Sequence, residues 1–314
     1  MRYTRAMIQV VSRFGWWWWG GVFVFFSGCG ICDNEYNFVV LGDGGKVYNP
    51  DSSPLSYVDV VREISPPILE EKLEGKDPYY MYLGGVLLYQ RMPGYDALEL
   101  DVSAVELLET SWGLGVVDAG YDLYKIFYNG IDVCIDRELG VQYLVSSASS
   151  GYAKSQEVLA QAYGGKVLQD SFDEDYAQSF FWFMKAASQG DKLSTVNVSL
   201  MLHEGLGVER DDELSFEWLS KVEDMPYGDE VTGLRKLAEF YELGIGTKVD
   251  VVQAYKYYDL VTPASAPDIA RLEAQMTPEQ IQEAIRLSRQ WQEEHNIFVP
   301  SYYGLEYQED GTFQ

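Results

Sequence analysis

The sequence repeats itself from about residue 77 onward, and this repeat limits the possible folds more than any other feature. An aromatic residue recurs at Tyr143, Trp182, Trp218 and Tyr257, so successive copies are separated by 39, 36 and 39 residues. A weaker first copy begins near Tyr82. Repeats of this length are typical of solenoids, in which each unit buries its apolar face only against its neighbours. Five copies therefore predict a stacked array with one continuous core.

Each copy has the pattern of a helical hairpin. In the last copy Leu234, Leu237 and Tyr241 recur at helical spacing and form an apolar stripe on the first helix. A Gly-x-Gly segment that begins at Gly244 then ends this helix, because glycine adopts the left-handed C-terminal conformation without steric cost. The recurring aromatic residue lies on the second helix. We predict an all-α fold, a superhelical solenoid of about five hairpins over residues 77–262.

A further helix is expected beyond the repeats. Thr277 is placed to cap its first turn, and Gln280 completes a capping box. The helix is expected to run to about His295 and to close the end of the solenoid. Residues 263–314 thus form a capping helix with an aromatic, acidic tail. Residues 296–314 either fold back over the last repeat, which we favour, or present their aromatic side chains to a partner.

The first thirty residues are typical of an export signal. Arg2, Arg5 and Arg13 make the beginning of the chain cationic, and an apolar run follows from Phe14 to Phe26. This run is too short to cross the ~30 Å hydrocarbon layer of a membrane comfortably as a helix. It fits the apolar region of a bacterial signal peptide better, so residues 1–28 are predicted to be a lipoprotein-type signal peptide.

A lipobox-like segment, Phe-Ser-Gly-Cys, ends at Cys29. Acylation of Cys29 would anchor the protein, and Gly30 in place of Asp favours the outer membrane, facing the periplasm. The alternatives are a signal without lipidation and an uncleaved anchor. Residues 29–76 are predicted to be a tether with a short helix near 57–64, because Pro66-Pro67 and other turn residues break regular structure.

The charge balance restricts the possible partners. The 314 residues contain 23 Lys+Arg and 49 Asp+Glu, which gives a formal net charge of −26. A surface this acidic repels phosphate backbones, so we expect no nucleic-acid partner and no membrane binding apart from the lipid anchor. It suits a protein partner with a basic face. Three cysteines are too few for a disulfide scaffold, and two histidines leave little material for metal or catalytic-triad chemistry.

No catalytic, metal or cofactor site is predicted, so we expect the protein not to be an enzyme. His203 stands beside Glu204 and could act as a base with its orienting carboxylate. A polar residue in the turn between two helices is the simpler interpretation. Cys134 is expected to be a buried or half-buried structural thiol. Two acidic clusters lack the alternating spacing of a calcium-binding loop and are better interpreted as solvated surface; they comprise Asp170, Asp173, Glu174 and Asp175, and Glu209, Asp211, Asp212 and Glu213.

Three motifs carry a resemblance to a known family. They are Tyr241-x-x-Gly244-x-Gly246, Gly205-x-Gly207-Val208, and Phe181-Trp182-x-x-Lys185-Ala186-Ala187-x-x-Gly190. These motifs resemble the Sel1-like repeats, which are relatives of the tetratricopeptide repeats. The resemblance covers roughly residues 80–262. The sequence departs from the family pattern at Lys125, where a small residue is usual, and at an acidic insertion over 170–175.

The resemblance implies a binding function. Exported Sel1-like proteins serve as scaffolds in envelope assemblies or as immunity proteins, some of which are periplasmic lipoproteins that neutralise phospholipase effectors of type VI secretion. We expect an immunity protein that blocks such a toxin, and the alternative is a scaffold for an outer-membrane export or cell-envelope assembly. Repeat geometry places the candidate contact residues beside the apolar stripes of first helices, on an acidic concave face; they are Glu157, Gln161, Asn197, Lys236, Glu239 and Phe240.

Overall fold

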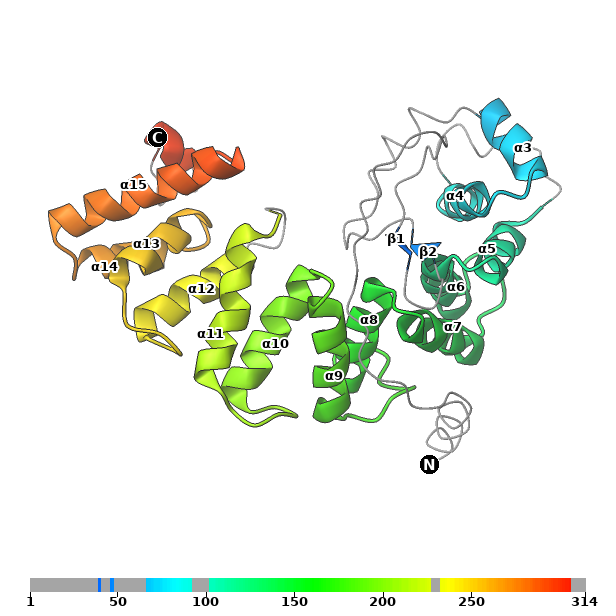
Figure 1. Ribbon diagram of the computed structural model, residues 1–314, viewed down its shortest axis with the longest axis horizontal. Helices are drawn as coiled ribbons and strands as arrows, with labels where there is room; N and C mark the ends of the chain where they lie inside the picture. Colours follow the sequence, from blue (N-terminus) through cyan, green and yellow to red (C-terminus); the bar gives the residue numbers. More distant parts are fainter. Residues whose placement is uncertain (1–38, 41–45, 48–65, 92–101, 227–231, 306–314) are drawn as a thin grey trace.

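The computed structural model describes residues 39–40, 46–47, 66–91, 102–226 and 232–305. Helices follow one another along a curved path from α3 to α15 (Figure 1). The described part of the chain is helical apart from one small antiparallel ladder, in which β1 (Val39–Val40) pairs with β2 (Lys46–Val47). The predicted all-α solenoid is therefore confirmed.

The predicted five hairpins are present, each a first helix packed against a second helix. They are α4 (Pro78–Tyr89) with α5 (Ala104–Gly113), α6 (Val117–Asn129) with α7 (Arg137–Ser149), α8 (Ala153–Tyr163) with α9 (Tyr176–Ala187), α10 (Lys192–Glu204) with α11 (Asp212–Ser220), and α12 (Thr232–Leu243) with α13 (Val251–Asp259). A short 3₁₀ helix, η1 (Lys221–Asp224), follows the fourth hairpin.

The turn inside each hairpin is built in a similar way. An aspartate caps the second helix in four of the five hairpins, accepting hydrogen bonds from backbone N–H groups of the first turn; these residues are Asp136, Asp175, Asp211 and Asp250. Gly205 and Gly244 end the first helices of the last two hairpins with φ of 70° and 69°. Part of the acidic excess at the turns is therefore structural.

The repeats share a core that runs from one hairpin to the next. In the last hairpin Leu234 and Leu237 are buried as the stripe predicted, and Tyr257 fills the space between the helices. Trp182 does the same in the third hairpin. Neighbouring hairpins contribute to the same clusters of buried side chains, so no hairpin completes its own core.

The N-terminal end of the array differs from the prediction. The helix α3 (Pro66–Glu74) begins at the two prolines that were expected to interrupt regular structure, and it packs against α4. Proline is tolerated there because the first turn of a helix needs no backbone N–H donor. The helix expected near 57–64 and the signal peptide with Cys29 lie outside the described residues.

The C-terminal end is closed by two helices, α14 (Ala266–Glu273) and α15 (Pro278–His295), followed by the 3₁₀ helix η2 (Pro300–Tyr303). The capping box of Thr277 and Gln280 is present as predicted. Of these two helices, α15 makes the more extensive packing against α13. The segment after α15 folds back, because Val299 is buried and Ser301 Oγ donates to Asp259 Oδ2 at 2.9 Å.

Candidate partner-binding surface

Each hairpin packs on the next chiefly through its second helix, which lies against the first helix of the following hairpin. Two pairs of first helices also pack, α10 against α12 and α4 against α6, whereas consecutive second helices do not pack to that extent in the described part of the chain. This arrangement places the first helices on the inside of the curve in Figure 1. We call their polar side chains the first-helix face; it comprises Asp122, Lys125, Lys154, Glu157, Gln161, Asn197, Lys236 and Glu239.

The acids of the first-helix face are paired with lysines of the same helix. Lys125 Nζ lies 2.7 Å from Asp122 Oδ1, one turn away. Lys154 contacts Glu157 at 2.5 Å, and the same one-turn pair recurs between Lys236 and Glu239 at 2.7 Å. These pairs neutralise the face in large part, so the acidic excess lies elsewhere. The expectation of a strongly acidic concave face is therefore wrong for this stripe.

The six predicted contact residues divide into two groups. Glu157 (3% exposed), Asn197 and Phe240 (2% exposed) are buried, so their side chains offer little surface to a partner. Gln161, Lys236 and Glu239 are partly exposed. Two of the six bind each other, since Gln161 Nε2 donates a hydrogen bond to Glu157 Oε1 at 2.6 Å. Binding of a partner by this set stays a prediction.

Lys125, the departure from the repeat pattern, has a structural role. Its ammonium lies 5.3 Å from the centre of the Tyr89 ring and 4.9 Å from that of Tyr121. Tyr89 Oη also donates to Asp122 Oδ1 at 2.7 Å, which joins the first hairpin to the second. A cation between two aromatic faces is attracted by both ring quadrupoles. The lysine thus fills a polar junction between repeats where a small residue would leave a gap.

The turn of the fourth hairpin holds His203. Its Nδ1 lies 2.6 Å from Asp212 Oδ1, and Arg210 binds the other oxygen of this carboxylate at 2.7 Å. The hydrogen bonds from Arg210 and His203 keep the pKa of Asp212 below its usual range. The predicted orienting partner, Glu204, is exposed instead. The His203 ring packs against Phe240 of the next hairpin, so the pair ties hairpins together.

The predicted acidic clusters lie in the turns of the third and fourth hairpins, where most of their carboxylates are exposed. Within the part of the chain that the structure describes, no group of three or more acidic, histidine or cysteine side chains could hold a metal ion. Cys134 is exposed in the turn of the second hairpin. The expectation of a buried thiol is wrong, because the residue lies between the two helices rather than on an apolar stripe.

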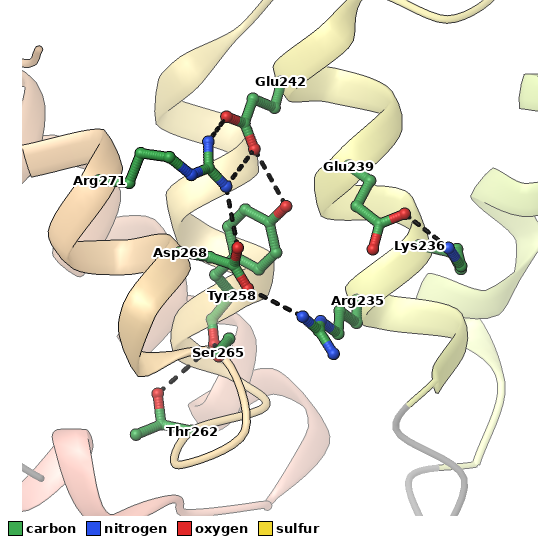
Figure 2. Close-up of polar contacts among 9 residues, drawn as sticks. All are labelled: Arg235, Lys236, Glu239, Glu242, Tyr258, Thr262, Ser265, Asp268 and Arg271. Carbon is green, nitrogen blue, oxygen red and sulfur yellow. Dashed lines mark hydrogen bonds and ion pairs between the residues drawn. The ribbon is translucent and has the colours of Figure 1, made fainter.

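A polar network fastens the last hairpin to α14 (Figure 2). Arg271 binds both oxygens of Glu242 and contacts Asp268 at 2.9 Å. Tyr258 Oη donates to Glu242 at 3.0 Å, while burial raises the pKa of this tyrosine to about 12. Arg235 adds a further bond to Asp268 at 3.1 Å. The network closes the C-terminal end of the first-helix face.

Comparison with known families decides what these hairpins are. The Sel1 repeat family matches residues 153–191, 193–221 and 232–260, which are the third, fourth and fifth hairpins. The chain contains Sel1 repeats. A solenoid of this kind presents an extended surface to protein partners. No helix among the described residues has the length and apolar character to span a bilayer.

Solved structures with Sel1-like repeats have a similar fold. A protective antigen of uropathogenic Escherichia coli aligns with a TM-score of 0.60 at 24% identity, over 76% of this chain and 50% of that one. A Sel1 repeat protein from Oxalobacter formigenes gives 0.51 at 16% identity, over 68% and 88%. An immunity protein from Pseudomonas aeruginosa gives 0.35 at 15% identity, over 72% and 86%.

A curated protein shares sequence similarity with part of the chain. The chitin synthase regulator of Saccharomyces cerevisiae is 28% identical over 149 residues, which is 45% of this chain and 20% of that protein. The chain thus spans a fifth of the yeast regulator and half of the Escherichia coli antigen.

The first two hairpins have the fold but lie outside the Sel1 matches. In the second hairpin Asp132 stands where Gly207 and Gly246 stand in later Sel1 repeats, and it adopts a left-handed φ of 57°. Aspartate tolerates this conformation better than most residues. Such substitutions preserve the turn while they remove the sequence motif.

Proposed function

We propose that this chain is a non-enzymatic, protein-binding lipoprotein that binds and neutralises a secreted toxin with a basic face. The observation that carries the proposal is the stack of five hairpins, in which the first helices of the second to fifth hairpins align polar side chains along a single extended stripe. Such a stripe suits a protein surface better than a small substrate. The toxin class we propose is a phospholipase effector delivered by type VI secretion.

The charge distribution supports a basic partner. The net charge of the whole chain is −26, the first-helix acids are paired, and exposed acids lie at the turns of the third and fourth hairpins. A field of this sign accelerates the encounter with a basic protein and repels nucleic acids. Neutralisation would then be steric, because the bound solenoid covers the active or membrane-docking face of the toxin.

The proposed location is the periplasmic side of the outer membrane, with acylated Cys29 as the anchor. Two or more acyl chains hold a protein stably, whereas one chain does not. Labelling with a palmitate analogue should mark the full-length protein and should be lost in Cys29→Ser. Cys32→Ser is the matched control and should retain the label. Retention of the label in Cys29→Ser would contradict the anchor.

The toxin proposal is tested by affinity capture from the native organism with the full chain, tagged at its C-terminus. We expect recovery of a lipase-like protein whose purified activity falls when the chain is added. Alanine at Gln161, Lys236 and Glu239 together should weaken this inhibition, whereas alanine at Gln290, exposed on α15, should not. Recovery of export-channel or wall components, without any inhibited enzyme, would contradict the toxin proposal.

The second candidate is a scaffold that organises or regulates an envelope enzyme. The similarity of part of the chain to a chitin synthase regulator favours it, since that protein's name describes control of an enzyme rather than neutralisation of a toxin. Deletion of the gene distinguishes the two functions. Loss of a scaffold should disturb the envelope on its own, whereas loss of an immunity protein should matter only when the toxin is present.

A further inference from the structure

A small strand ladder from the N-terminal part of the chain lies on the second hairpin. β1 and β2 pair in antiparallel register, Val39 with Val47 and Val40 with Lys46. β2 packs more extensively against α6 than against any other helix. Figure 1 shows the ladder beside α6 on the inside of the curve, which is the side of the first-helix face. We call these four residues the N-terminal ladder.

We infer that the first-helix face at α6 is a binding site for an extended segment without net charge, and that the N-terminal ladder of the same chain occupies it. The inference rests on the proposed function only in so far as the first-helix face is the partner surface. It deepens that proposal, because a partner that covers the whole face must first displace the ladder. The ladder is thus an autoinhibitory contact between the N-terminal part of the chain and its proposed binding surface.

The helical neighbours of α6 cover its other sides. α5 and α7 pack extensively against α6, and α4 adds a smaller contact. Leu123 and Ile126 face these neighbours and are fully buried. Asp122 and Lys125 lie instead on the first-helix face, where the side chain of Lys125 is 31% exposed. An element that approaches α6 from the inside of the curve therefore meets these polar residues and the tyrosine rings beside them.

This side of α6 has little net charge, and the same holds for the segment that lies on it. Lys125 Nζ lies 2.7 Å from Asp122 Oδ1, so the two charges neutralise each other. The tyrosine rings on either side of this lysine add apolar surface. Residues 36–50, which include both strands, contain one acid and one base, Asp43 and Lys46, and so carry no formal net charge. A neutral segment rich in valine and aromatic residues can lie on such a surface without burying an unpaired charge.

The ladder depends on α6 for its stability. Its two strands have two residues each, and a two-stranded hairpin is at best marginally stable by itself in water. Packing against a helix supplies the support that such a hairpin lacks. The same weakness makes the ladder displaceable, since elements with few buried contacts open at a low cost in free energy. A cover that is weak alone but held nearby by the chain is suited to competition with a partner.

Chemical crosslinking of the full chain tests where the ladder lies. An amine-reactive crosslinker should join Lys46 of β2 to Lys125 of α6, and should join Lys125 to Lys154 of α8 as an internal reference. Val40→Pro combined with Val47→Pro changes one residue of each paired position, and proline cannot donate to a ladder. We expect the yield of the Lys46–Lys125 crosslink to fall at least fivefold in this double variant, while the reference crosslink is unchanged.

A peptide added in trans tests whether the site accepts an extended segment. The probe is a fluorescently labelled synthetic peptide of residues 36–50, and its binding is followed by fluorescence anisotropy. We expect the double proline variant to bind it at least tenfold more tightly than the native chain, whose own ladder occupies the site. A scrambled peptide of the same composition should show no such difference. Asn34→Pro, outside both strands, is the matched control and should resemble the native chain in both experiments.

Equal binding of the peptide by the native chain and the double variant, or a Lys46–Lys125 crosslink that survives the two prolines, would overturn the inference. Neither measurement needs a toxin, so their failure is distinguishable from a failure of the proposed function. If they fail while a toxin is captured and inhibited, the proposed function stands without this cover. If they hold while no toxin is neutralised, the toxin proposal fails and the ladder stands as a cover of the first-helix face.

Discussion

The contact between consecutive hairpin turns is the most sensitive point of this solenoid. Gly246 has a φ of 63° and lies directly against the backbone of Asp212, the first residue of α11. A Cβ at position 246 would overlap the carbonyl group of Asp212 and would lie 2.9 Å from Phe216 Cβ. Both obstacles belong to the preceding hairpin and cannot rotate away as a flexible side chain could. Gly246→Ala must therefore push two hairpins apart.

The expected cost has two parts. Holding alanine in the left-handed region costs roughly 1–2 kcal/mol, and forcing an extra carbon into a packed contact costs a further ~1–3 kcal/mol. Gly190→Ala isolates the first part, because Gly190 has a φ of 89° and an added Cβ would meet no atom within 4 Å. We expect a loss of about 1–2 kcal/mol for Gly190→Ala and about 2–5 kcal/mol for Gly246→Ala.

Urea unfolding followed by circular dichroism at 222 nm measures both variants. In a repeat array, weakening one junction also reduces cooperativity, so Gly246→Ala should show a shallower or two-step transition, whereas Gly190→Ala should show a shifted transition of native shape. Equal midpoints and equal slopes for the two variants would refute the packed-junction argument. The loss would then come from backbone conformation alone.

Three further outcomes are expected from the polar groups. Glu242→Gln should lower the free energy of unfolding by about 1 kcal/mol, because the carboxylate binds Arg271 and Tyr258. Arg91→Gln breaks only the exposed ion pair with Asp132, so it should lower the free energy of unfolding by less than ~0.5 kcal/mol. Burial raises the pKa of Asp259. The protonated carboxyl therefore stabilises the fold fully below the unfolded-state pKa, and this contribution is lost as pH rises through the folded-state pKa. The free energy of unfolding of the native protein, relative to that of Asp259→Asn, should fall over the same pH range. Absorbance at 295 nm should show a tyrosine class with a pKa of about 12, including Tyr124, whose neutral form contributes stability below pH 10 that is lost as pH rises through about 12.

The repeat spacing was sufficient to predict the hairpins, because helix, turn glycine and aromatic residue each depend on a local pattern. The capping box at Thr277 was predicted residue by residue for the same reason. The partner of His203 was not, since Asp212 lies nine residues away and is brought near only by the geometry of the turn. No local rule reports that distance, although an aspartate caps the second helix in four of the five hairpins and Asp212 directly follows one of them, Asp211.

The burial of predicted contact residues has a related cause. A first helix inside a solenoid packs against its own second helix and against both neighbouring hairpins, so most of its circumference is covered. Phe240 stands beside the apolar stripe in sequence, yet the preceding hairpin covers it through His203. An isolated hairpin would leave this position open. Sequence periodicity within one copy therefore overestimates the open surface of every inner repeat.

Several side-chain bonds of this protein join one hairpin to the next. Lys256 donates to Glu223, Lys166 to Asn197, and Arg91 to Asp132. Several of the scarce cations are thus used to join neighbouring hairpins or to neutralise first helices. The uncompensated acids that remain are mostly exposed at the turns and on the outer helices. The stacking of the repeats and the proposed attraction of a basic partner therefore depend on the same allocation of charge.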